Sequence, residues 1–361
     1  MKISAIIKLT SFLFLCTISQ TVFSQNSKII ADSIAMEHFK DSTNIGLSIG
    51  IIKNDFVDTY YYGGKYVREQ KDIDSTTLFE IGSVTKLYTA YILASLETEE
   101  KIDRFDLLSK YLPDSVYIDK KWSSKIRLVD LATHISGLPQ FESTKSLMNL
   151  EGFDENNPYG IFTESFMMRV LKETDTLNNY GQINYSNFGI GLLAYALEKS
   201  QNLSFEQLFE IYLIDKHNLE NTFLKLTENE LTDIAIPHRK SEKMPLIQLA
   251  SLSPSGSIKT SMPDLLEFLE LHIRKPKNVA NVIDIVLQDQ LNGPEQTVGL
   301  GWGIYKVENE TVYFHNGGTY GSSSIVIIVP EKSVGIAILS NNSSDRQLTS
   351  YALTMIKKLI E

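Results

Sequence analysis

The stretch Phe79-Glu80-Ile81-Gly82-Ser83-Val84-Thr85-Lys86 decides how the rest of this 361-residue sequence is interpreted, because two patterns meet in it. Its first half belongs to Thr77–Ile81, a run typical of a short strand. Its second half opens Ser83–Glu99, where good helix formers carry apolar residues at helical spacing. We therefore expect Ser83 and Lys86 to lie one turn apart on the same face of a helix.

A serine and a lysine in this arrangement point to acyl transfer. A serine hydroxyl is a weak nucleophile until a base removes its proton, and a lysine can be that base only when it is neutral. The hypothesis is that Ser83 is the nucleophile and Lys86 its proton acceptor. The S-x-x-K spacing is common by chance, and a helix-capping serine followed by a solvated lysine is the alternative interpretation.

Strand patterns occupy both ends of the chain. Ile45–Ile52 and Val57–Gly63 predict a hairpin closed by Lys53-Asn54-Asp55. The C-terminal third predicts four more strands and a closing helix: Trp302–Val307, Thr311–His315, Ser323–Val329, Val334–Ser340 and then Asp345–Ile360.

The middle of the chain is predicted to be mainly helical. A further helix, Leu265–Ile273, is expected to start at the cap Ser261. Strands at both ends predict one α/β lobe built from residues of about 25–82 and 246–361, with a helical lobe of about 83–245 inserted. The expected helices of that middle part are Phe105–Tyr111, Arg127–Thr133, Ile161–Lys172, Asn187–Lys199 and Phe205–Asp215.

The first 24 residues resemble a signal peptide. Lys2 and Lys8 precede a mostly apolar run, and the small Ser24 favours cleavage before Gln25. A membrane anchor is the alternative, but the run is short and interrupted by polar residues. We expect a periplasmic or secreted protein, residues 25–361, with no stable membrane insertion.

The composition excludes several classes of function. Cys16 is the sole cysteine and follows Leu15, where a lipoprotein site needs a small residue. Removal of the signal would leave no thiol nucleophile, disulfide or cysteine-bound zinc. The net charge of −10 and the lack of a basic stripe argue against a nucleic-acid partner. The six histidines include no H-E-x-x-H motif, so no metal and no cofactor are predicted.

Two short motifs are interpreted as structural. Gly46-Leu47-Ser48-Ile49-Gly50 matches the G-x-S-x-G nucleophile elbow, but no helix follows it. Ser48 is therefore expected to be a buried strand residue. Gly299-Leu300-Gly301-Trp302-Gly303 lacks the spacing and context of a dinucleotide loop and is expected to be a tight turn before a strand.

A second cluster, Tyr185-Ser186-Asn187, lies just before a predicted helix. A tyrosine near the nucleophile can relay a proton to the leaving group. An asparagine can contact Lys86 and a substrate amide at the same time. The alternative is a loop in which Asn187 caps the helix.

A third cluster, His315-Asn316-Gly317-Gly318-Thr319-Tyr320-Gly321, ends a predicted strand. Its glycines would let a substrate backbone lie against the strand edge. A backbone N–H there could join that of Ser83 in an oxyanion hole, and His315 would add a polar, partly charged group. The alternative is a glycine-rich turn.

In this order the three clusters resemble the penicillin-recognising serine hydrolases, with their S-x-x-K, Y-x-N and K-T-G or H-x-G motifs. That superfamily includes class C β-lactamases, secreted DD-peptidases, D-aminopeptidases and esterases. The resemblance spans nearly all of the mature chain and implies their α/β fold, an antiparallel sheet flanked by helices with an inserted helical lobe. Further matching stretches are Leu131-Ala132-Thr133-His134-Ile135-Ser136-Gly137-Leu138-Pro139, Ser255-Gly256-Ser257-Ile258 and Gly299-Leu300-Gly301-Trp302.

The resemblance also implies roles for individual residues. Ser83 would form the acyl-enzyme, and Lys86 and Tyr185 would share the proton transfers. His134 would support the fold. The substrate-binding residues would be Asn187, His315, Gly317 and Gly318, the last supplying an oxyanion-hole N–H together with that of Ser83.

The third cluster bears on the substrate. Class C β-lactamases carry a lysine where this chain has His315, and a histidine with an ordinary pKa of about 6.5 would hold a carboxylate only in part. The S-D-N and Glu-x-x-Leu-Asn motifs of class A are missing, so fast deacylation would rely on Tyr185, Lys86 or His315. The first hypothesis is a peptidase or esterase acting on D-amino-acid peptides or small esters. A β-lactamase and a non-turnover penicillin-binding sensor or scaffold are the alternatives.

Overall fold

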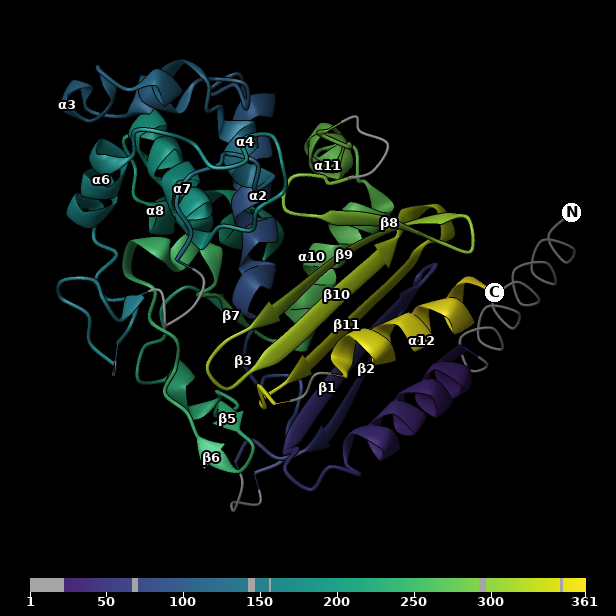
Figure 1. Cartoon of the computed structure of the whole chain (residues 1–361). Helices are drawn as coiled ribbons and strands as arrows, with labels where there is room; N and C mark the ends of the chain where they lie inside the picture. Colours follow the sequence, from purple (N-terminus) through teal and green to yellow (C-terminus); the bar gives the residue numbers. More distant parts are fainter. Residues whose placement is uncertain (1–22, 67–70, 142–146, 156, 292–296, 345–346) are drawn as a thin grey trace, which may run out of the picture.

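A computed structural model describes residues 23–66, 71–141, 147–155, 157–291, 297–344 and 347–361 of the chain. Most of the predicted signal segment, with Cys16, lies outside the described residues. The architecture is mixed α/β, with a twisted sheet beside a group of helices (Figure 1). Within the part of the chain that is described, no helix is both long and apolar enough to cross a membrane.

The main sheet has six strands in the order β2-β1-β11-β10-β9-β8, and each neighbouring pair is antiparallel. All six strands were predicted. β9 extends past its predicted end because Gly317 and Gly318 pair with Ser324 and Ser323 of β10, so the glycine-rich turn is excluded for these two residues. The strands are β1 (Gly46–Lys53), β2 (Phe56–Gly63), β8 (Gly303–Val307), β9 (Glu310–Gly318), β10 (Ser323–Val329) and β11 (Val334–Ser340).

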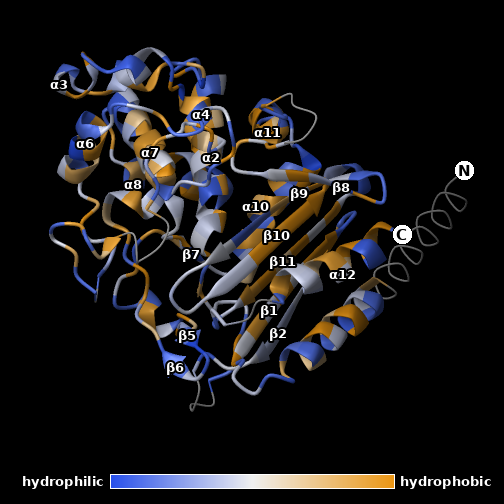
Figure 2. Cartoon of the chain, viewed as in Figure 1, coloured by the Kyte–Doolittle hydropathy of each residue, from blue (hydrophilic) through white to orange (hydrophobic). Residues whose placement is uncertain are grey.

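Alternate side chains of a strand point to opposite sides of a sheet, and in β1, β10 and β11 both sides are buried. Ile325 and Ile327 of β10 face one hydrophobic cluster, whereas Val326 and Ile328 face the other. Helix 23–38 and α12 (Leu348–Ile360) cover the first face, where Figure 2 shows an apolar stripe on each. α10 (Met262–Arg274) packs on the second face.

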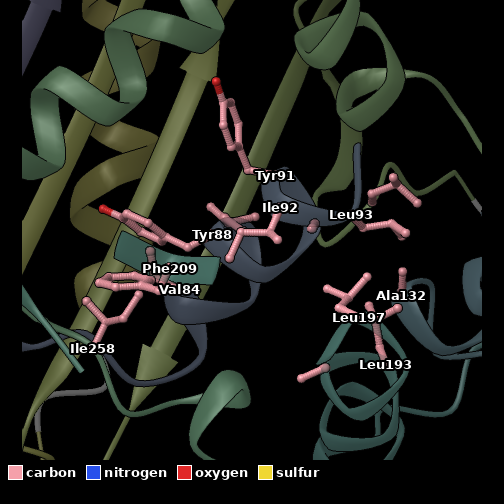
Figure 3. Close-up of a cluster of buried hydrophobic side chains, with 14 of the residues drawn as sticks. Val84, Tyr88, Tyr91, Ile92, Leu93, Ala132, Leu193, Leu197, Phe209 and Ile258 are labelled. Atoms are coloured by element: carbon pink, nitrogen blue, oxygen red, sulfur yellow. The ribbon is translucent and has the colours of Figure 1, made fainter. Parts of the chain in front are cut away.

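α2 (Thr85–Thr98) lies at the centre of the helical part and is buried over nearly its whole length. A helix that is apolar on all sides is stable only when other elements surround it. Figure 3 shows its neighbours, which come from α4 (Leu128–Ala132), α7 (Asn187–Gln201), α8 (Phe205–Phe209) and the segment before β7 (Lys259–Thr260). The labelled side chains are Val84, Tyr88, Tyr91, Ile92, Leu93, Ala132, Leu193, Leu197, Phe209 and Ile258.

The remaining elements are short or peripheral. The other helices are α3 (Asp114–Tyr117), α4 (Leu128–Ala132), α6 (Glu164–Glu173), α7 (Asn187–Gln201), α8 (Phe205–Phe209), α9 (Asp215–His217) and α11 (Ala280–Leu287). The minor sheets are β3 (Phe79–Glu80), β7 (Lys259–Thr260) and β4 (Thr222–Phe223), and the pair β5 (His238–Arg239) with β6 (Glu242–Lys243).

Some predictions about these elements were wrong or incomplete. Helix 23–38 and α11 were not predicted. Of Phe105–Tyr111, only Leu108–Tyr111 forms a 3₁₀ turn, because Leu108 N donates to Ile126 O instead of to its own segment. The cap at Ser261 is confirmed, since its side chain accepts from Asp264 N. The division into lobes near residues 82 and 245 stays a prediction.

Helix 23–38 gives a test of how the first face of the sheet is covered. Ile34 is 6% exposed and packs on the sheet, whereas Ile29, five residues earlier, is 66% exposed. We expect Ile34→Ala to lower the free energy of unfolding by about 2–4 kcal/mol, the usual cost of a cavity. Ile29→Ala should change it by less than about 0.5 kcal/mol. Urea unfolding of both variants would contradict this packing if the two losses were equal.

Candidate active site

Ser83 lies in a 3₁₀ turn, Gly82–Val84, between β3 and α2. The turn begins at Gly82, whose φ of +49° favours glycine over residues with a side chain. Regular α-helix starts at Thr85, so Ser83 precedes the helix that it was expected to open. The predicted proximity of Ser83 and Lys86 is confirmed, since their side chains meet at 3.0 Å.

Lys86 is fully buried and has an acceptor for each of its three N–H groups. Its Nζ donates to Ser83 Oγ at 3.0 Å, to Asn187 Oδ1 at 2.7 Å and to Ser255 O at 2.7 Å. A buried ammonium is costly unless it is paired in this way. The solvated lysine of the alternative interpretation is therefore excluded. Ser255 had been noted only as part of a recurring stretch, without a role.

Tyr185 contacts both the nucleophile and Lys86. Its hydroxyl donates to Ser83 Oγ at 2.5 Å, and its ring lies 4.7 Å from Lys86 Nζ. α7 is capped by Ser186, whose Oγ accepts from Gly189 N at 2.9 Å. Asn187 is thus not the cap, contrary to the alternative interpretation, and its side chain is available to Lys86.

His134 holds the loop that carries Tyr185. The φ of His134 is +61°, its carbonyl accepts from Asn184 N at 2.7 Å, and its Nδ1 accepts from Ser186 N at 3.2 Å. Its ring lies against the Tyr185 ring with the centroids 4.5 Å apart. Burial lowers the pKa of His134 well below its usual value, so Nδ1 stays an acceptor. These contacts agree with the supporting role expected for His134.

The end of β9 packs directly on the Ser83 turn. A Cβ on Gly317 would lie 2.0 Å from Ile81 O and 2.9 Å from Ser83 N. A Cβ on Gly82 would lie 2.6 Å from Gly318 N. The glycine at 317 is therefore required by the protein's own backbone, whereas the expectation was that it would admit a substrate. At Gly318 the nearest atom to an added Cβ would be 3.9 Å away.

His315 is buried beside this contact and is neutral at neutral pH. Its Nδ1 bonds to Asn316 O at 2.7 Å, which places the ring proton on Nδ1. Burial, together with the charge of Lys86, lowers the pKa of His315 to about 3. The expected partial positive charge is therefore absent at neutral pH.

Glu80 is a site residue that sequence reasoning missed. It is 1% exposed, and its carboxylate accepts from Ile247 N and from Thr319 Oγ1, each at 2.6 Å. Lys259 lies opposite it in the β3–β7 pair. Burial raises the pKa of Glu80, while the two hydrogen bonds and Lys259 oppose that change. A carboxylate inside a predicted buried strand was the signal that could have identified it.

The two short motifs that were interpreted as structural, G-x-S-x-G at Gly46–Gly50 and the glycine-rich Gly299–Gly303, behave as predicted. Ser48 is a fully buried residue of β1, and Gly301, with a φ of +74°, forms the turn before β8. Over the described ranges, no three His, Cys, Asp or Glu side chains are grouped so as to hold a metal ion.

Comparison with known proteins places these residues in a family. The family model described as Beta-lactamase matches residues 33–355. The chain belongs to the Beta-lactamase family. Members of this family are generally serine hydrolases of small molecules. The mixed α/β architecture with its antiparallel sheet agrees with that fold, as the sequence predicted.

Individual relatives of this Beta-lactamase family chain are distant. A "Beta-lactamase" of Providencia stuartii is 25% identical over 346 residues, covering 86% of this chain and 85% of that protein. A "Beta-lactamase" of Pseudomonas fluorescens is 26% identical over 350 residues, covering 87% and 93%. "Protein flp" of Staphylococcus aureus (strain MW2) is 23% identical over 313 residues, covering 83% and 60%.

The contact between β9 and the Ser83 turn gives a matched pair of variants. Gly317→Ala should lower the free energy of unfolding by about 1–3 kcal/mol, because its methyl group overlaps Ile81 O. Gly318→Ala meets only open space and should leave that free energy within about 0.5 kcal/mol. Thermal unfolding measures both. Equal stability of the two variants would contradict the close contact between Gly317 and Ile81 O.

Proposed function

We propose that this chain is a serine acyl hydrolase that forms its acyl-enzyme at Ser83. The observation that carries the proposal is the convergence of two proton-transfer groups on one oxygen. Lys86 Nζ lies 3.0 Å and Tyr185 Oη 2.5 Å from Ser83 Oγ. A nucleophile within hydrogen-bond reach of a base that is itself oriented by other groups is the signature of covalent catalysis.

Lys86 acts as the base in this proposal, and its hydrogen bonds determine the direction of its lone pair. When Lys86 is neutral, its two N–H groups stay on Asn187 Oδ1 and Ser255 O. The lone pair then points at the third position, Ser83 Oγ, and accepts its proton as the acyl bond forms. Tyr185 passes a proton to the leaving group. The same two residues, with His315 beside them, serve deacylation, for which no dedicated glutamate was predicted.

The developing oxyanion would be held by the backbone N–H groups of Ser83 and Gly318. The packing of β9 on the Ser83 turn supports this role, because a Cβ on Gly82 would lie 2.6 Å from Gly318 N. Backbone donors fixed by packing need no reorganisation during the reaction, which is why such a site is effective. Asn187 would contact the amide of a peptide substrate in addition to Lys86.

The proposed substrates are D-amino-acid peptides or small esters. The neutral His315 supports uncharged esters over β-lactams, because it offers no fixed charge for a lactam carboxylate. The same argument counts against a peptide that ends in a free carboxylate. The second candidate is a β-lactamase, which the names of the Providencia stuartii and Pseudomonas fluorescens relatives favour. The proposed location is the periplasm or the exterior, where such substrates occur.

Removal of the nucleophile is the direct test. Ser83→Ala should reduce hydrolysis of 4-nitrophenyl butyrate at least about 10³-fold and abolish labelling by a fluorophosphonate. The variant lacks the hydroxyl that Lys86 contacts and would deprotonate. Lys86→Ala should lose nearly as much, since the two residues act as a unit. Ser48→Ala is the matched control, a buried serine on β1 that should keep its activity. Retained activity in Ser83→Ala would refute the proposed mechanism.

Intact-protein mass after mixing with benzylpenicillin separates the candidate functions. A penicilloyl adduct that lasts many minutes would favour a peptidase or a sensor over a β-lactamase. Hydrolysed antibiotic without a lasting adduct would make the chain a β-lactamase. We expect intact antibiotic and little adduct, because neutral His315 does not hold the carboxylate.

A further inference from the structure

A cleft of about 670 Å³ opens beside the proposed catalytic residues. It is lined by Tyr185 and His134, by most residues from Thr297 to Lys306, and by Phe314–Asn316 of β9. Tyr185 thus has its ring in the wall of the cleft and its hydroxyl on Ser83 Oγ. The group that protonates a leaving oxygen must face it, so a leaving group would occupy this cleft.

Most of the side chains that line this cleft are apolar or aromatic. Tyr305 is 60% exposed and packs edge-on against Phe314, with the ring centroids 4.9 Å apart. Trp302, a third aromatic residue of the lining, is buried. The apolar and aromatic lining residues are Ile183, Val298, Trp302, Ile304, Tyr305 and Phe314. Such a surface favours a flat apolar group by burial and ring stacking.

Lys86 does not line the cleft, and its Nζ is directed at Ser83, Asn187 and Ser255. The charge that does line the cleft lies far from the reacting end. Lys306 is the one lining residue in the described chain with a permanent positive charge, and its Nζ donates to Thr311 Oγ1 at 2.6 Å. The register pairs Gly303 with Phe314 and Lys306 with Thr311, so Lys306 is three residues, about 10 Å, further along β8. A carboxylate on a small leaving group would not reach it.

The two histidines beside the reacting end present neutral groups. His315 uses its Nδ1 proton on Asn316 O, which leaves Nε2 as an acceptor. Nδ1 of His134 accepts from Ser186 N, which places a proton on Nε2. That Nε2 is buried and has no hydrogen-bond partner in the described structure. Neither histidine therefore offers a positive charge to a group in the cleft.

We propose that this cleft binds the leaving group of the substrate and selects an uncharged aromatic or alkyl alcohol over one that carries a carboxylate. The inference rests on the proposed function and narrows it to esterase activity. In the reaction, the bond from Ser83 Oγ to the acyl carbon forms and the bond from that carbon to the leaving oxygen breaks. The proton released by Ser83 ends on the leaving oxygen, and water later releases the acid.

Two esters that differ by one methyl group and one charge test the choice of leaving group. Methyl 3-acetoxybenzoate and 3-acetoxybenzoate transfer the same acetyl group and differ in the charge of the phenol that leaves. We expect kcat/KM to be at least tenfold higher for the methyl ester, because the cleft offers no partner for the carboxylate. Equal values, or a preference for the carboxylate, would overturn the inference.

The controls separate this inference from the proposed function. If Ser83→Ala abolishes hydrolysis of both esters but the wild-type protein shows no preference, the function stands and the inference fails. If neither ester is hydrolysed, or if Ser83→Ala has no effect, both fail.

Variants of residues that line the cleft test whether the cleft causes the preference for an uncharged leaving group. His315→Lys should narrow the ratio of the two kcat/KM values by several-fold, because it puts a cation at the reacting end. Tyr305→Ala should lower kcat/KM for methyl 3-acetoxybenzoate about fivefold relative to ethyl acetate, because the larger phenol loses its stacking surface. Leu353→Ala, an exposed residue of α12 outside the cleft, is the control and should keep that ratio. An unchanged ratio in Tyr305→Ala would contradict the placement of the leaving group.

Discussion

The burial of Lys86 is the constraint on which the rest of the site depends. Its three hydrogen bonds reach the Gly82–Val84 turn, the first residue of α7 and the turn at Ser255, so one side chain joins three segments far apart in sequence. Removing one of these acceptors leaves a buried N–H group without a partner, which costs about 1–3 kcal/mol, so the three contacts support one another. The same three contacts leave Lys86 one direction in which to accept a proton, toward Ser83.

The sheet supplies the other half of the site. Because both of its faces are covered by helices, the position of β9 is fixed, and the glycines at its end can press against the Ser83 turn. Glu80 stabilises this contact, because its carboxylate accepts hydrogen bonds from Thr319 Oγ1 and from Ile247 N. The proposed oxyanion hole thus depends on packing that extends well beyond the residues that would touch a substrate.

Sequence patterns predicted helices and strands well where the apolar residues recurred at a clear helical or strand spacing. The strands of the main sheet and α7 and α10 appear within a few residues of their predicted ends. The failures have local causes. Phe105–Leu107 is not helical because its backbone pairs with the segment near Ile126, and helix 23–38 was overlooked beside the apolar signal segment. The spacing of apolar residues does not report hydrogen bonds between distant segments. It also does not separate a helix from an apolar segment that adjoins it.

The sequence by itself determined which residues could carry acyl-transfer chemistry, since Ser83, Lys86, Tyr185, Asn187 and His315 could be named from spacing and family resemblance. The tertiary structure decided their states and their additional partners. The neutral His315 arises from burial and from the nearby charge of Lys86. The Ser255 carbonyl on Lys86, the hydrogen bond from Thr319 to Glu80 and the apolar cleft arise from segments distant in sequence. A motif gives the identity and order of side chains, whereas protonation and pocket chemistry depend on burial and on neighbours that only folding brings together.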